Sequence, residues 1–226
     1  MSMQNWLGLN TSHLTQLNDK HWLHSDVVRP FLALQTSAQK SGIDLQLVSS
    51  FRDFEKQCNI WNRKWNGQLP TLSANNQPID MSALADNEKM HAIMRWSALP
   101  GASRHHWGTD IDVYDKSAVV KSGQKFQLIA EEYTDNGPCA ALNSWLTEHA
   151  EEFGFYRPYA RYCGGIGAEP WHLSFHSVAV NISEQFDKLQ LLALIKSSSL
   201  AGKTTVMQHF EQIYCQYILN QGKPAT

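Results

Sequence analysis

One stretch in the middle of the chain reads SRHHWGTDIDVYD and joins a histidine-rich loop to a segment that alternates like a strand. In that segment Ile111 and Val113 fall on one face of the expected strand. Asp110 and Asp112 fall on the opposite face. Gly108 permits a tight bend between the loop and the strand. The stretch therefore predicts a sheet whose polar face carries carboxylates beside histidines.

The remaining pattern predicts an α+β fold. Apolar side chains recur at helical spacing in three segments: residues 26–41, 53–65 and 142–153. Apolar and polar residues alternate, as in strands, in three others: residues 43–50, 154–159 and 173–180. We therefore expect a small antiparallel sheet that is flanked by helices and carries the functional site.

The end of the chain differs in character from the rest. Two amphipathic helices are predicted there, so we expect a catalytic or binding domain over 1–180 and a helical extension packed on it over 181–226. Residues 66–82 are rich in Gly, Pro, Asn and Ser, which predicts a long loop of the kind that borders binding sites.

Composition narrows the class of partner. The chain has 226 residues and a formal net charge of −2, so it lacks the basic excess of nucleic-acid-binding and anionic-membrane-binding surfaces. The first residues show neither a cationic start nor a long apolar run, and the four cysteines are scattered. We expect a cytoplasmic protein with reduced thiols, or a periplasmic one if a leader is missing from the sequence. The oligomeric state stays open.

Two short motifs offer metal ligands. His105 precedes Asp112 by seven residues, and GAEPWHLSF places Glu169 three residues before His172. A catalytic zinc site takes three protein ligands and leaves one position open. A hydrolytic site also needs a carboxylate that takes a proton from water. Glu169 and His172 suit those two roles, although each motif alone is a weak signal.

Taken together, these segments resemble the zinc D-alanyl-D-alanine carboxypeptidases of the vancomycin-resistance type, which share a fold with the hedgehog signalling domain. The resemblance rests on S-x-H-x-x-G-x-x-x-D from Ser103 and on E-P-W-H from Glu169. A third segment, SSFRDFEKQ, is similar to an upstream S-x-Y-R-x-x-x-x-Q stretch of these enzymes. The resemblance covers roughly residues 25–180.

The resemblance implies Zn²⁺ as the cofactor, bound by His105, Asp112 and His172. It also implies that Glu169 deprotonates the attacking water and then protonates the leaving amine. The expected partner is a peptide substrate that ends in D-alanine, without nucleic acid or membrane.

Substrate binding would fall to another group of residues. The resemblance implies that Arg52, Gln57 and Ser103 bind the terminal carboxylate or steady the tetrahedral intermediate. Independently, a planar guanidinium binds a carboxylate with two charge-assisted hydrogen bonds, which favours Arg52 for this role. Trp171 and Trp107 would either form a wall for the substrate's methyl groups or belong to the core.

The implied function is zinc-dependent hydrolysis of the terminal D-alanine of peptidoglycan-type peptides. An L,D-carboxypeptidase or a cell-wall endopeptidase with the same site is the nearer alternative. A zinc-bearing binding module without catalysis is the alternative of another class. The presence of Glu169 argues against a binding module, because a binder has no need of a base.

Three polar neighbours leave the family pattern or compete with it. Asp110 replaces the alanine that is commonest two residues before the aspartate ligand. We interpret it as a partner of a ligand, with an alternative ligand or a repulsive charge as the other options. His106 is expected on the surface or beside a ligand, and His176, which shares strand parity with His172, is expected to be structural.

Overall fold

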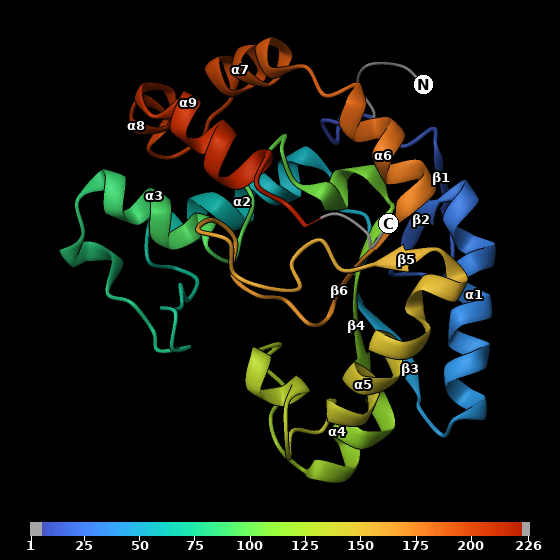
Figure 1. The fold of residues 1–226 in the computed structure, drawn as a ribbon. Coiled ribbons are helices and arrows are strands. Elements are labelled where there is room, and N and C mark those ends of the chain that lie inside the picture. Colours follow the sequence, from blue (N-terminus) through green and yellow to red (C-terminus); the bar gives the residue numbers. More distant parts are fainter. Residues whose placement is uncertain (1–5, 223–226) are drawn as a thin grey trace.

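A four-stranded antiparallel sheet lies between two groups of helices (Figure 1). The computed structural model describes residues 6–222. The sheet has the order β3 (Leu45–Ser49), β4 (Asp110–Asp115), β6 (His172–Phe175) and β5 (Phe155–Tyr156). A separate hairpin pairs β1 (Leu14–Gln16) with β2 (Trp22–His24). The predicted α+β class with a small antiparallel sheet is confirmed.

The register of the sheet brings the two sequence motifs together. Asp112 on β4 stands directly opposite His172 on β6, and Asp110 stands opposite Ser174. Directly opposed residues project to the same face of a sheet with their Cβ atoms about 4.5–5.5 Å apart. On the other side of β4, a register shift before Ser49 brings that residue opposite Asp112.

One hydrophobic core covers the sheet. The stripe predicted in α1 (Ser25–Lys40) is buried through Val27, Phe31, Leu34 and Ala38. It packs in one cluster with the buried apolar residues of β4 and of α5 (Ala140–His149). The helix predicted over 142–153 changes to a 3₁₀ turn at Ala150–Phe153. This core fixes the sheet and leaves its polar face to the site.

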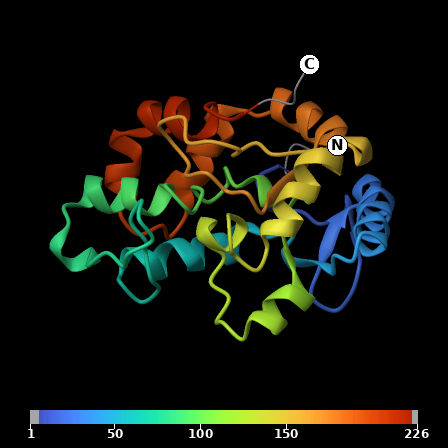
Figure 2. The ribbon, with the colours of Figure 1, turned by 60° about the horizontal axis from the view of Figure 1, so that its bottom comes forward.

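A second core joins helices from both halves of the chain. It combines α2 (Phe54–Trp65) and α3 (Asp86–Met94) with helices that follow the sheet. These later elements are α6 (His176–Glu184), α7 (Lys188–Ser197), α8 (Lys203–Gln208), α9 (Phe210–Ile213) and a π-helical turn, Tyr214–Ile218. Figures 1 and 2 show α8 and α9 beside α2 and α3.

The boundary expected at residue 180 falls inside α6. The helices that follow the boundary share the second core with α2, and the Trp61 indole donates a hydrogen bond to the Ala201 carbonyl at 3.0 Å. The C-terminal helices are therefore continuous with the core around α2.

One predicted strand is wrong in its second half. Residues 173–180 were expected to be extended, but β6 ends at Phe175 and α6 begins at His176. Val178, Ala179 and Ile182 are buried together at helical spacing, and this packing overrides the strand preference of the β-branched residues. Because His176 opens a helix, it does not share strand parity with His172, and it is exposed.

Short elements complete the fold. Four are turns or short helices: Met81–Ala83, Arg104–Trp107, α4 (Lys116–Ser122) and Ala130–Tyr133. The four cysteines are free thiols, as expected. Within residues 6–222, every helix is too short or too polar to cross a lipid bilayer.

Candidate metal centre

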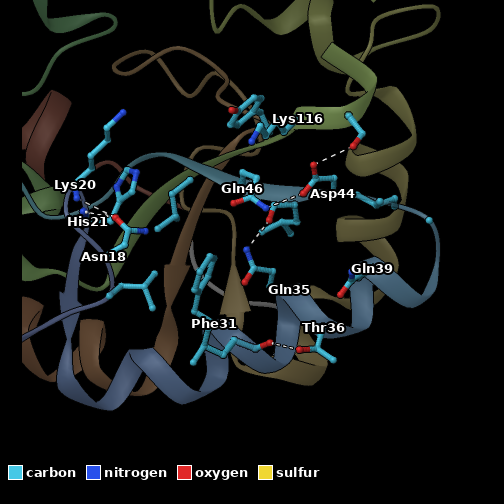
Figure 3. A pocket seen from close by; sticks show the side chains of 18 of the residues that line it. Asn18, Lys20, His21, Phe31, Gln35, Thr36, Gln39, Asp44, Gln46 and Lys116 are labelled. Carbon is cyan, nitrogen blue, oxygen red and sulfur yellow. Dashed lines mark hydrogen bonds between the residues drawn. The ribbon is translucent and has the colours of Figure 1, made fainter. Parts of the chain in front are cut away.

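Several cavities open among the described residues, and two of them border the sheet. The larger, of about 1080 Å³, runs along α1, the outer edge of β3 and the loop that holds Asn18 (Figure 3). Its lining is mainly polar, with Gln35, Gln46, Asp44 and Lys116 around it, and none of the predicted site residues belongs to it. Size alone therefore does not identify the site.

The second cavity, of about 490 Å³, contains the predicted chemistry. Its wall includes seven of the eight predicted site residues: Arg52, Ser103, His105, Asp112, Glu169, Trp171 and His172. The loop predicted to border a binding site contributes Pro70, Leu72 and Asn76. Gln57 is the one predicted residue that does not line this cavity.

His105, Asp112 and His172 form a compact, buried triad. Each offers one ligand atom, and these atoms all lie within 4.8 Å of one another. The Asp112 carboxylate faces both rings, with His105 Nε2 at 3.3 Å and His172 Nδ1 at 3.0 Å. Gly108 has a positive φ of 70° and lies against the backbone of Leu23 and His24, so a side chain there would clash. Glycine thus permits the bend between His105 and Asp112.

The outer nitrogens of both rings have partners that define their tautomers. His105 Nδ1 lies 3.0 Å from the Ser50 carbonyl, which only accepts, so this nitrogen carries the proton. His172 Nε2 lies 3.0 Å from the Asp110 carboxylate. His105 Nε2 and His172 Nδ1 therefore face Asp112 and are the nitrogens available to an ion. Two imidazoles and one carboxylate, with an acceptor behind each imidazole, match the donor set of a catalytic zinc site.

Glu169 lies beside the triad without replacing any of its members. Its Oε2 is 3.4 Å from His172 Nδ1, and the residue is buried. A backbone turn holds it, because the Glu169 amide donates to the Tyr159 carbonyl and the His172 amide donates to the Glu169 carbonyl. Burial, aided by the Asp112 carboxylate, raises the pKa of Glu169 to about 8. A carboxyl group with such a pKa suits proton transfer near neutral pH.

The Arg52 guanidinium is held rigidly at the pocket wall. One terminal amino group donates to Gln57 Oε1 at 2.7 Å and the other donates to Ser49 Oγ at 3.0 Å. Gln57 is wholly buried, and its own amide donates to the Ala98 carbonyl at 2.7 Å. Because the oxygen and the nitrogen of the Gln57 side-chain amide are both hydrogen-bonded, Gln57 orients Arg52 from outside the cavity. A second N–H of each amino group remains for a ligand.

Lys64 is a pocket cation that the sequence reasoning missed. It lies on α2, is mostly buried, and donates from Nζ to Ser97 Oγ at 2.6 Å. Burial and the nearby Arg52 charge lower the pKa of Lys64 to about 8, although Glu169 opposes this. Its position seven residues after Gln57 places both residues on one face of the helix, but this spacing does not show that the face borders the cavity.

Asp110 and His106 are both buried. Asp110 lies 3.0 Å from His172 Nε2, where the interpretation as a partner of a ligand places it. His106, expected on the surface or beside a ligand, is wholly buried and links two loops. Its Nδ1 donates to the Arg52 carbonyl at 2.6 Å, and its Nε2 accepts from the Gly101 amide. Burial lowers the pKa of His106 to about 3, which keeps the ring neutral.

The two tryptophans divide between wall and core. Trp107 is buried in the second core, with the Arg104 guanidinium 4.5 Å above its ring. Trp171 lines the cavity and packs against Tyr133 with the ring centroids 5.6 Å apart. Of these two, Trp171 is the one placed to contact a ligand in the cavity.

Comparisons with solved structures show the same fold. VanYB in complex with D-alanine-D-alanine aligns with a TM-score of 0.54 at 19% identity, over 82% of this chain and 89% of that chain. A vancomycin-resistance D,D-pentapeptidase VanY variant in complex with Zn(II) gives 0.52 at 20% identity, over 87% and 92%. The LdcB LD-carboxypeptidase gives 0.53 at 18% identity, over 88% and 78%.

Sequence comparisons assign the family. An uncharacterised protein of Haemophilus influenzae is 34% identical over 123 residues, which cover 54% of this chain and 93% of the relative. The family model of VanY, a D-alanyl-D-alanine carboxypeptidase, matches residues 20–178, which include the triad, Glu169 and Arg52. The chain belongs to the VanY family of D-alanyl-D-alanine carboxypeptidases.

Proposed function

We propose that the protein is a zinc-dependent D,D-carboxypeptidase that removes the terminal D-alanine from peptidoglycan-type peptides. The observation that carries this proposal is the combination, in one cavity, of a buried His105–Asp112–His172 triad with Glu169 and Arg52. Family membership and the likeness to VanY-type structures support the same activity.

His105 Nε2, Asp112 and His172 Nδ1 would hold the zinc ion. When bound, zinc polarises the scissile carbonyl and lowers the pKa of a water molecule towards ~7. Asp110 and the Ser50 carbonyl keep the two rings in the tautomers that this ligation needs.

Glu169 would move the proton in both halves of the reaction. It takes the proton of the attacking water on its carboxylate and then delivers that proton to the amine of the departing D-alanine. Its buried position supports both steps, since a raised pKa makes the carboxyl a better base and lets it hold the proton until the amine leaves.

Arg52 and Lys64 would bind the terminal carboxylate of the substrate. Arg52 offers two N–H donors from a plane fixed by Ser49 and Gln57, and Lys64 adds a second positive charge on the wall of the same cavity. A carboxylate entering between them relieves the repulsion of two mostly buried cations. This pair favours a carboxypeptidase over an endopeptidase, whose substrate has no carboxylate at that point.

An L,D-carboxypeptidase uses the same recognition of a free carboxylate and is the second candidate. The likeness to the LdcB LD-carboxypeptidase supports it at the level of the fold. The two candidates differ in the configuration of the residue before the scissile bond, which would pack against the wall formed by Trp171 and Tyr159.

The deciding assay measures D-alanine release by the zinc-loaded protein from a pentapeptide that ends in D-Ala-D-Ala. A tetrapeptide that ends after one D-alanine tests the L,D activity in parallel. Glu169→Gln keeps the shape of the side chain and removes the base, so it should abolish release while zinc remains bound. If neither peptide is cleaved by the wild-type protein, both carboxypeptidase assignments are refuted.

Cellular location and macromolecular partners stay predictions. A cytoplasmic location, with a periplasmic one as the alternative, would be decided by fractionation of cells that express the full gene. The charge balance supports a peptide substrate without nucleic acid or membrane. We also propose that residues 1–180 carry the catalytic residues and that 181–226 pack on them as an extension.

A further inference from the structure

The end of the described chain returns to the metal centre. After α9 the chain runs back towards the β5 side of the sheet (Figure 1). The Gln221 side-chain oxygen accepts a hydrogen bond from Arg104 Nη1 at 2.7 Å, and the Gly222 amide donates to the Pro158 carbonyl at 2.8 Å. These contacts lie beyond residue 178, where the match to the family model ends.

Arg104 is a buried cation with every nitrogen engaged. Its Nε donates to Asp110 Oδ1 at 2.6 Å, and its Nη2 donates to the hydroxyls of Tyr156 and Ser174. Gln221 takes Nη1. Since a guanidinium has a fixed, planar set of donors, these partners define one position for the charge.

Asp110 links Arg104 to His172 through its carboxylate. Its carboxylate is wholly buried and accepts from Arg104, from the Thr109 hydroxyl at 2.6 Å and from Ser174 Oγ at 3.1 Å. On its other side it faces His172 Nε2 at 3.0 Å. A buried aspartate at this point needs Arg104 as its counter-charge.

We propose that the C-terminal segment 216–222 is a working part of the metal centre, and that it positions His172 through Gln221, Arg104 and Asp110. An imidazole can bind a metal through either nitrogen, and the partner of the outer nitrogen decides which one is free. Asp110 holds the proton on Nε2 and leaves Nδ1 for the ion. Gln221 holds Arg104 in place, and Arg104 in turn holds Asp110. Asp110, Arg104 and Gln221 are therefore positioning residues.

A second set of contacts ties the same segment to the loop before Glu169. Gln216 Nε2 donates to the Gly164 carbonyl at 2.6 Å, and Asn220 Nδ2 donates to the Cys163 carbonyl at 2.6 Å. The Gln216 carbonyl packs so closely on Gly165 that a Cβ at this position would collide with it. The C-terminal segment therefore contacts both the network behind His172 and the loop that leads to Glu169.

This inference deepens the proposed function and assumes its metal site. The test measures zinc affinity of the full chain by competition with a chromophoric chelator, without any peptide. Gln221→Ala removes the link to the C-terminal segment, and exposed Gln208 on α8 provides the matched control, Gln208→Ala. We expect zinc affinity about 3- to 10-fold weaker in Gln221→Ala, below the 10- to 100-fold typical of partners that touch a ligand directly, and an unchanged value in the control.

A second variant keeps the test valid if a lone buried charge prevents folding. Arg104→Met with Asp110→Ala removes both charges together, which is tolerated better than the removal of one partner. We expect about 10- to 100-fold weaker zinc binding with a cooperative thermal transition retained. Zinc affinity within twofold of wild type in the folded double variant would overturn the role of Asp110.

Nitrogen NMR of ¹⁵N-histidine-labelled, zinc-loaded protein separates positioning from general stability. We expect the wild type to show His172 with Nδ1 on the metal and a protonated Nε2 held by a hydrogen bond. The Nε2 proton of His172 should exchange faster in Gln221→Ala and lose its hydrogen-bonded shift in the double variant, with the His105 signals retained. An unchanged His172 signature and zinc affinity in Gln221→Ala would overturn the role of the C-terminal segment.

Peptide hydrolysis by the wild type is measured separately, so that failure of the proposed carboxypeptidase function can be distinguished from failure of the proposed positioning of His172. A wild-type protein that binds zinc without cleaving either peptide refutes the proposed function, while the variant series still decides the positioning of His172. A wild-type protein that binds no zinc refutes both.

Discussion

Replacing Lys64 by methionine should stabilise the protein and impair it as an enzyme. Lys64 is a mostly buried ammonium whose pKa falls from an ordinary 10.5 to about 8, chiefly through burial and then through Arg52. A pKa difference of this size corresponds to roughly 3 kcal/mol that opposes the charged form in the folded protein. Methionine keeps the apolar stem of the side chain and removes the charge. We therefore read Lys64 as a residue kept for substrate binding at the expense of stability.

The stabilisation expected from Lys64→Met is smaller than the free-energy cost of the buried charge. Ser97 loses the donor that Lys64 provides at 2.6 Å, which offsets about 1 kcal/mol. About 2 kcal/mol of stabilisation remains, or a rise in Tm of roughly 4–8 °C for a chain of this size. At pH 7 the ammonium is protonated in both the folded and the unfolded chain, so the full cost of the buried charge destabilises the wild-type protein. Between pH 8 and 10.5 the folded protein releases this proton first, so the advantage of Lys64→Met should shrink as pH rises.

Activity should move in the opposite direction. Loss of one charge-assisted contact to the terminal carboxylate lowers kcat/KM by roughly 10- to 100-fold, as expected for about 1.5–3 kcal/mol. Lys125→Met is the matched control, because Lys125 lines the same cavity but is exposed. Thermal melts over a pH series and initial rates on the pentapeptide measure both effects. A lower Tm together with an unchanged kcat/KM would refute the reasoning and make Lys64 a structural cation.

Four further predictions follow, three of them from the same site and one from a buried histidine outside it. Glu169→Gln should lower kcat by about 10²- to 10⁴-fold and leave zinc stoichiometry, measured by atomic absorption, at wild-type level; retained turnover would contradict its role as base. Arg52→Lys should lower kcat/KM by at least ~10-fold, because an ammonium does not reproduce the two-pronged contact or the bonds to Ser49 and Gln57; equal rates on amidated and free peptides would contradict carboxylate recognition. Stripping zinc with a chelator should abolish hydrolysis and lower Tm, with recovery on adding zinc; activity that survives dialysis against chelator would exclude the metal. Burial and the neighbouring His24 lower the pKa of His13 to about 4. As the pH is lowered from 6.5 to about 4, the unfolded chain therefore binds this proton before the folded protein does, and the free energy of unfolding should fall. Urea titrations over this pH range should show a weaker fall in His13→Leu.

The local pattern of the sequence carried most of the fold. The stripe of α1 and the cap at Asp53, which accepts from the Lys56 amide at 2.6 Å, depend on neighbours within a few residues, so periodicity and capping rules find them. The strand prediction failed after Phe175 because burial of Val178 and Ile182 against distant helices decided the conformation there. The strand preference of single residues gives no information about a contact with helices that are distant in the sequence.

The sequence by itself determined the inventory of the site. The two motifs supply the nitrogen and carboxylate donors and the nearby base that a zinc hydrolase needs, and the resemblance to the carboxypeptidase family implies which of them bind the ion. Only the tertiary structure decided what surrounds them. It placed Lys64 on the cavity wall, set Gln57 behind Arg52, and brought Gln221 to Arg104 across 117 positions of sequence. Those roles depend on contacts between segments that meet only when the cores pack, and no local pattern records such a contact.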